Sequence, residues 1–184
     1  PSATTPSAAR SRSSSRSMSP GKKHERHCLV AMPHGRNLEE ARWFQGWLNR
    51  VIKPAIELSG YVPIAPPAVD LPQALSQATL SHLTGDPMMV VDLGGITPEA
   101  GLDPIVLYEL GIRHALGLPV VLMGWKGQHL PFDAGKLAII LEGRALIDLA
   151  ENRTRLRENI KAAAAGAFGC PLGKRKSAAD PDST

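Results

Sequence analysis

The sequence predicts a three-layer α/β domain of flavodoxin type, in which a parallel sheet of probable strand order 2-1-3-4-5 lies between two layers of helices. Short apolar runs suited to buried strands alternate along the chain with longer segments of helical periodicity. Such alternation requires a parallel sheet with right-handed crossovers. The 184 residues are enough for one domain with a hydrophobic core.

Composition divides the chain into a domain, residues 27–168, and two tails. Residues 1–26 are rich in Ser, Ala, Pro and Arg and carry six basic residues against one acidic residue, which predicts a disordered basic tail. An organelle-targeting segment is the alternative. A second disordered tail is expected over residues 169–184. The chain between the tails carries twelve basic and fourteen acidic residues, so we expect no nucleic-acid binding through the domain.

Cysteine content and hydropathy indicate a reducing, cytoplasmic setting. The two cysteines, Cys28 and Cys170, form neither a disulfide framework nor a metal site. No secretory apolar segment and no run long enough to cross a membrane occurs, so we expect no membrane partner. The sequence also has no HExxH motif, no CxxC pair and no clustered His/Asp ligands, and a metal is therefore not expected.

The first strand and the first helix begin the domain. His27–Met32 is a short apolar run, which predicts a buried parallel strand. Asn37 with Glu40 three residues later resembles a capping box that begins a helix reaching Ile56. Pro54 lies inside the helical pattern and is expected to kink it or loosen a turn, because proline has no backbone N–H to donate.

The rest of the domain repeats the alternation. The expected strands are Tyr61–Ala65, Met88–Asp92, Pro119–Met123 and, for the fifth, either Leu137–Leu141 or Ala145–Leu149. The expected helices run from Asp70 to about Leu83, from Asp103-Pro104 to about Leu116, and from Glu151 to about Phe168. Aspartate is a good N-cap and proline suits the first helical position, which supports the second of these helices.

Glu109 is the residue expected to carry the chemistry. At helical spacing it falls beside Ile105 and Val106 on an apolar face, where a carboxylate loses solvation and gains nothing by packing. Arg113 lies four residues later, so a structural helix ion pair is an equally weighted alternative. Asp92 favours the chemical interpretation, because it ends a buried strand at the edge where open parallel sheets bind ligands.

The loops after the first, third and fourth strands are expected to converge at this edge. Besides Asp92, the candidate binding residues there are Pro33, His34, Gly35, Arg36, Gly94, Asp103 and Trp125. Gly35 before a helix N-terminus leaves backbone N–H groups that suit a phosphate. The alternative interpretation of His34 is that it is only a turn residue. Trp125, in the loop after the fourth strand, could stack on a base or cover the edge of the core.

Four stretches spread over residues 27–165 carry a resemblance to a known family. They are Cys28-Leu-Val-Ala-Met-Pro-His-Gly, Val51-Ile-Lys-Pro-Ala-Ile-Glu, Leu130-Pro-Phe-Asp and Val106-Leu-Tyr-Glu-Leu-Gly-Ile-Arg-His-Ala-Leu-Gly-Leu-Pro-Val-Val-Leu-Met. Together they resemble nucleoside 2-deoxyribosyltransferase-like proteins, a group related to TIR-like domains. The resemblance covers nearly all of the predicted domain.

The resemblance implies cleavage of an N-glycosidic bond, by hydrolysis or base exchange. It makes Glu109 the catalytic carboxylate, has Asp92 orient or protonate the leaving base, and adds Tyr108 to the substrate-binding residues. The expected partner is a small nucleoside or nucleotide, with NAD as a substrate rather than a cofactor, and no cofactor is expected. Family members often carry Asn-Pro-Asn where Asp103-Pro104-Ile105 stands here, so the sugar contacts are expected to differ.

Two classes of function remain open at this point. The first is an enzyme in which a carboxylate stabilises or attacks an oxocarbenium-like sugar, chemistry that needs neither a metal nor a redox cofactor. The second is a non-catalytic nucleotide-sensing or self-associating module. In either case we expect a homo-oligomer.

Overall fold

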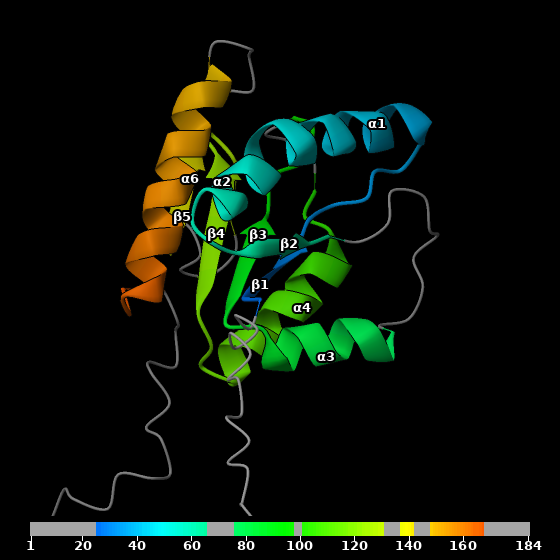
Figure 1. The fold of residues 1–184 in the computed structure, drawn as a ribbon. Coiled ribbons are helices and arrows are strands. Elements are labelled where there is room, and N and C mark those ends of the chain that lie inside the picture. Colours follow the sequence, from blue (N-terminus) through cyan, green and yellow to red (C-terminus); the bar gives the residue numbers. More distant parts are fainter. Residues whose placement is uncertain (1–24, 66–75, 98–100, 131–136, 142–147, 168–184) are drawn as a thin grey trace, which may run out of the picture.

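A computed structural model of the chain describes residues 25–65, 76–97, 101–130, 137–141 and 148–167 (Figure 1). Within these ranges five parallel strands form one sheet of order β2-β1-β3-β4-β5. This confirms the predicted three-layer α/β fold of flavodoxin type. The two predicted tails lie outside the described residues, apart from Glu25 and Arg26.

The strands agree closely with the sequence pattern. Their bounds are β1 (His27–Ala31), β2 (Val62–Ile64), β3 (Met88–Asp92), β4 (Val120–Trp125) and β5 (Ala138–Leu141). The fifth strand therefore follows the first of its two predicted positions. In the centre of the sheet Val90 is in register with Val30 on one side and Val121 on the other.

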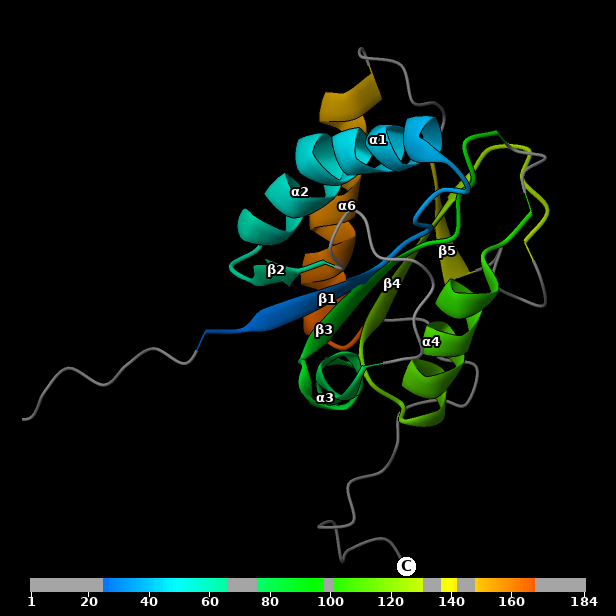
Figure 2. The same cartoon turned by 90° about the vertical axis from the view of Figure 1, so that its right-hand side faces the viewer.

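Two layers of helices cover the sheet (Figures 1 and 2). On one side are α1 (Leu38–Trp47), the π-helix η1 (Leu48–Ile52), α2 (Lys53–Glu57) and α6 (Leu149–Ala164). On the other are α3 (Gln77–Gly85) and α4 (Pro104–Ala115). Alternate strand residues belong to two separate cores, such as Val90 to the first side and Met89 to the second. No helix in the described ranges is long and apolar enough to span a bilayer.

Side-chain caps explain where the helices begin. Asn37 Oδ1 accepts from the Glu40 N–H at 3.0 Å, and Asp103 Oδ1 accepts from the Ile105 N–H at 2.8 Å. Both predicted starts are thereby confirmed.

The predicted start of the helix after β2 is wrong. Residues 66–75, which include Asp70, lie outside the described ranges, but Ser76 has extended backbone angles and α3 begins after it. Ser76 Oγ accepts from the Thr79 N–H at 3.1 Å. An ordinary serine cap therefore sets this boundary.

Pro54 has the predicted effect on the first long helix. The helix passes from α1 through the five-residue π-helix η1 before α2 begins next to the proline. The N–H of Lys53 bonds to the carbonyl of Leu48, five residues earlier. Because Pro54 cannot donate to a carbonyl, the preceding turn widens into the π-helix.

Arg113 joins α4 to the amino edge of the sheet. Its side chain is fully buried, and its guanidinium donates to the carbonyls of Leu83 at 2.8 Å and Asp86 at 2.7 Å. It also donates to the carbonyl of Pro119 from two nitrogens, at 3.2 and 3.3 Å. Burial lowers the pKa of Arg113 to about 10, and the Asp86 carboxylate opposes part of this change. One side chain thus fixes the end of α3 and the entries to β3 and β4.

We expect Arg113→Met to destabilise the protein by about 3 kcal/mol, because the carbonyls of Leu83 and Asp86 lose their buried donor and that of Pro119 keeps only the Met89 N–H. Urea denaturation followed by circular dichroism measures the change. Arg42→Met, on an exposed position of α1, is the matched control and should leave the midpoint nearly unchanged. Equal midpoints for Arg113→Met and the wild type would contradict this role.

Candidate active site at the carboxyl edge of the sheet

The carboxyl ends of β1, β3 and β4 lie at one edge of the sheet. Figure 2 shows the segments that follow these three strands leaving the sheet on the same side. The predicted residues Pro33–Arg36 follow β1, Asp92 ends β3, and Gly94 comes two residues later. This is the edge at which open parallel sheets bind ligands.

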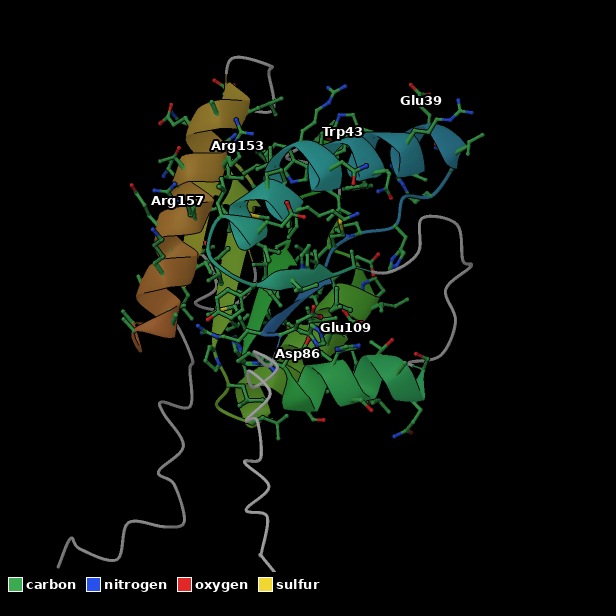
Figure 3. The ribbon with its side chains drawn as sticks, viewed as in Figure 1. Glu39, Trp43, Asp86, Glu109, Arg153 and Arg157 are labelled. Carbon is green, nitrogen blue, oxygen red and sulfur yellow. The ribbon has the colours of Figure 1, made fainter. Side chains whose placement is uncertain are left out.

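Glu109 borders the buried stripe of α4. The fully packed residues of this helix are Val106, Leu110 and Arg113, and Glu109 is partly buried beside them (Figure 3). Glu109 therefore lies at the border of the apolar face and not in its middle, where the sequence pattern predicted it. Burial raises the pKa of Glu109 from its ordinary value of 4.5 to about 7, and the charge of Asp103 adds to the effect.

The alternative role of Glu109, a helix ion pair with Arg113, is wrong. The Arg113 guanidinium donates to three backbone carbonyls and forms no ion pair with Glu109. Within the described part of the chain, Glu109 has no basic partner to hold it ionised. A partly buried carboxyl group of this kind is available for proton transfer or for contact with a cationic ligand.

Asp103 acts in the structure as the N-cap of α4 and as a neighbouring negative charge. Its Oδ1 accepts from the Ile105 N–H at 2.8 Å, and Pro104 takes the first helical position. Its charge contributes to the raised pKa of Glu109. A direct contact between Asp103 and a ligand stays a prediction.

Asp92 is fully buried at the end of β3. Its Oδ1 accepts from the Gly94 N–H at 2.8 Å, which closes an Asx-turn at the strand end. Strand alternation places Asp92 on the same face as Val90, the side covered by α1 and α6. Glu109 comes from α4 on the other side, so the two carboxylates can share a ligand only beyond the ends of the strands.

Gln128 joins the loops after β3 and β4, and the sequence reasoning did not single it out. Its Nε2 donates to the Leu93 carbonyl at 2.7 Å, while its Oε1 accepts from the Trp125 N–H at 3.1 Å. A polar side chain in the turn directly after a buried strand is the signal that could have found it. Gln128 therefore holds the backbone directly after Asp92 to the backbone of Trp125 at the end of β4.

The loop after β1 packs tightly against α1. Gly35 has φ +85°, and a Cβ atom there would lie 2.5 Å from the Ala41 nitrogen. The Glu40 carboxylate accepts from the Arg36 N–H at 2.7 Å and pairs with its guanidinium at 2.8 Å. These hydrogen bonds from Arg36 hold the pKa of Glu40 below its ordinary value. A phosphate at this helix N-terminus would therefore compete with Glu40, so phosphate binding at Gly35 and Arg36 stays a prediction.

Trp125 and Tyr108 differ widely in exposure, and contact of either with a ligand stays a prediction. The prediction that Trp125 lies in a loop is wrong: it is the last residue of β4, is 5% exposed, and packs its ring 5.2 Å from that of Trp47. This favours the alternative in which Trp125 covers the core. Tyr108 is 62% exposed on α4, whereas His34 is partly buried in the loop after β1.

The opposite, amino edge of the sheet gathers His27, His82 and Asp86. This group is not visible as a cluster of His/Asp ligands in the sequence, because His27 is far from the other two residues along the chain. The four-residue spacing of His82 and Asp86 is the local signal that could have pointed to them. Among the described residues, no such group of His, Cys, Asp and Glu occurs at the carboxyl edge.

Comparisons with known proteins add little to this geometry. No family model matches the chain, and no curated protein is similar to it. Among solved structures it is similar to an oxidoreductase from Corynebacterium diphtheriae, with 12% sequence identity and a TM-score of 0.40. The match covers 78% of this chain and 97% of that one. A similarity this weak says nothing about substrate or reaction.

We expect Glu109→Gln to stabilise the protein by about 1–2 kcal/mol near pH 8, and by almost nothing near pH 4. The folded state holds the proton of Glu109 more tightly than the unfolded state, so wild-type stability falls as pH rises from about 4.5 to about 7. Urea denaturation across this range measures the difference, with Glu158→Gln on the exposed side of α6 as the baseline. A constant difference between Glu109→Gln and the wild type at all pH values would contradict the raised pKa.

Proposed function

We propose that this protein cleaves the N-glycosidic bond of a nucleoside, a nucleotide or NAD, by hydrolysis or base exchange, with Glu109 as its catalytic carboxylate. The observation that carries the proposal is the state of Glu109. It is partly buried, has no ion pair among the described residues, and has a pKa raised to about 7. Carboxyl groups perturbed in this way are typical of catalytic sites. The resemblance to nucleoside 2-deoxyribosyltransferase-like proteins assigns the same residue.

The chemistry of the bond suits such a carboxylate. Cleavage passes through an oxocarbenium-like sugar, whose positive charge an ionised carboxylate stabilises or attacks. A pKa of about 7 leaves roughly half of Glu109 ionised at neutral pH, and the developing positive charge favours the ionised form further. If Glu109 must be ionised, base release should rise with pH and level off above about 7.

Asp92 is assigned to the leaving base. It lies at the end of β3 with its Oδ1 held by the Gly94 N–H, so its position is fixed independently of Glu109. Glu109 and Asp92 come from opposite sides of the sheet, so the substrate would lie across the strand ends, with the sugar toward α4 and the base toward Asp92. The loop Pro33–Arg36 would then bound the base side.

A second candidate function is a non-catalytic module that senses nucleotides or self-associates. The observation that favours it is the exposure of large apolar side chains on the surface. Leu38 on α1, Leu58 at the end of α2 and Tyr108 on α4 are each about 60% exposed. They lie on opposite sides of the sheet, so each offers a separate contact to another copy and together they form no continuous patch. A homo-oligomer in the cytoplasm is compatible with both candidates.

We expect Glu109→Gln to reduce base release at least about 100-fold while the protein stays folded, because glutamine cannot carry the negative charge or transfer the proton. The assay incubates the full chain with NAD and with a panel of ribo- and deoxyribonucleosides. Chromatography then measures nicotinamide or free nucleobase.

Glu158→Gln is the matched control, because it makes the same change at an exposed position of α6 and should leave base release unchanged. Circular dichroism confirms that both variants are folded. Equal base release by Glu109→Gln and the wild type would contradict the catalytic role. Tight nucleotide binding without turnover, unaffected by Glu109→Gln, would favour the non-catalytic module.

A further inference from the structure

Three potential metal ligands meet at the amino edge of the sheet, on the side opposite to the candidate active site. His27 is the first residue of β1, His82 lies in the last turn of α3, and Asp86 is the residue that caps that helix (Asp86 is labelled in Figure 3). One ligand atom from each lies within 4.8 Å of the other two. Two imidazoles and one carboxylate are a donor set typical of zinc sites.

The distances among these atoms are close to those in a coordination sphere. His82 Nδ1 lies 3.1 Å from both Asp86 oxygens, and His27 Nδ1 lies 4.0 Å from Asp86 Oδ1. Tetrahedral zinc with bonds of about 2.0–2.1 Å separates its ligand atoms by about 3.3 Å. The His82–Asp86 pair already meets this spacing. His27 Nδ1 needs to approach Asp86 Oδ1 by less than about 1 Å, and with all three ligand atoms within 4.8 Å of one another a side-chain rotation of His27 supplies the movement.

The surroundings fit a site that a metal can enter. Asp86 is 7% exposed, whereas the side chains of His27 and His82 are 36% and 30% exposed, so the carboxylate is fixed and the imidazoles face solvent. The other ring nitrogen of His27, Nε2, lies 3.9 Å from Glu25 Oε2. This distance is too long for a hydrogen bond and the Glu25 side chain is 76% exposed, so Glu25 adds only a nearby negative charge to the site.

A plainer interpretation explains only part of this arrangement. His82 and Asp86 could form a local contact at the end of α3, with Asp86 also facing the buried positive charge of Arg113. The His27 ring also packs edge-to-face against that of His82, with centroids 5.8 Å apart, but this packing does not by itself require His27 Nδ1 to lie 4.0 Å from Asp86 Oδ1. The charge of Arg113 opposes a cation, so we expect weaker binding than in a closed zinc site. The two imidazoles favour Zn²⁺ over Mg²⁺ or Ca²⁺.

We propose that His27, His82 and Asp86 bind one Zn²⁺ ion, which links the start of β1 to the end of α3. These two segments are separated by most of the first half of the domain. Arg113 donates to the Asp86 carbonyl, so the ion would also stiffen the contact between α3 and the helix that carries Glu109. The ion is a structural link at the amino edge and takes no part in the proposed cleavage reaction.

Isothermal titration of the full chain with zinc sulfate tests the site. We expect one equivalent bound by the wild type, and affinity reduced at least about 100-fold in His27→Ala and in His82→Ala, because each removes a ligand. His129→Ala removes an exposed histidine elsewhere and should bind as the wild type does. Glu25→Gln should weaken binding by less than about 10-fold, because its carboxylate is exposed and makes no hydrogen bond to His27. Magnesium chloride should give no one-to-one binding.

A second measurement uses the wild type alone, in case a histidine variant does not fold. In nuclear magnetic resonance spectra, Zn²⁺ should shift the imidazole signals of His27 and His82 and leave those of His34 and His129 in place. Zinc should also raise the melting temperature, since it binds only the folded protein. The proposal is overturned if no one-to-one binding occurs, if either His27→Ala or His82→Ala binds as tightly as the wild type, or if the shifts fall on other histidines.

Discussion

The arrangement of this domain depends on one buried guanidinium. Arg113 reaches from α4 to the carbonyls of Leu83, Asp86 and Pro119, which belong to the end of α3 and to the segments entering β3 and β4. The hydrogen bonds to Leu83 and Asp86 are buried, and the partly buried Pro119 carbonyl also accepts from the Met89 N–H, so the guanidinium is needed most by the first two. Planar geometry and several N–H groups allow arginine to serve all three at once. The position of α4 over the sheet follows from this contact.

The same contact explains why Arg113 and Glu109, one turn apart on α4, do not form an ion pair. A glutamate four residues before an arginine ordinarily pairs with it on a helix surface. Here Arg113 is committed to the interior, so Glu109 is left at the border of the core without that partner. Desolvation and the capping Asp103 then raise its pKa. A structural requirement at one end of the helix thus produces a chemically unusual carboxyl group near its middle.

The fold was largely predictable from the sequence, because strand composition, helix caps and the position of Pro54 act locally. Asn37 and Asp103 are followed by helices, and Met88–Asp92 reads as a buried strand on its own. What the sequence could not provide depends on segments far apart in the chain. The bridge from Gln128 to Leu93, the burial of Trp125 against Trp47, and the meeting of His27 with Asp86 exist only after folding. Whether Glu109 pairs with Arg113 was likewise decided by the tertiary contacts of Arg113.

Gln128 couples the positions of two segments at the carboxyl edge of the sheet. Its single side-chain amide is bonded at once to the backbone after β3 and to the backbone at the end of β4. Neither segment can shift without breaking a hydrogen bond or carrying the other along. A molecule that displaced the turn at Gly94 would therefore displace the end of β4 as well, and the two segments would move together.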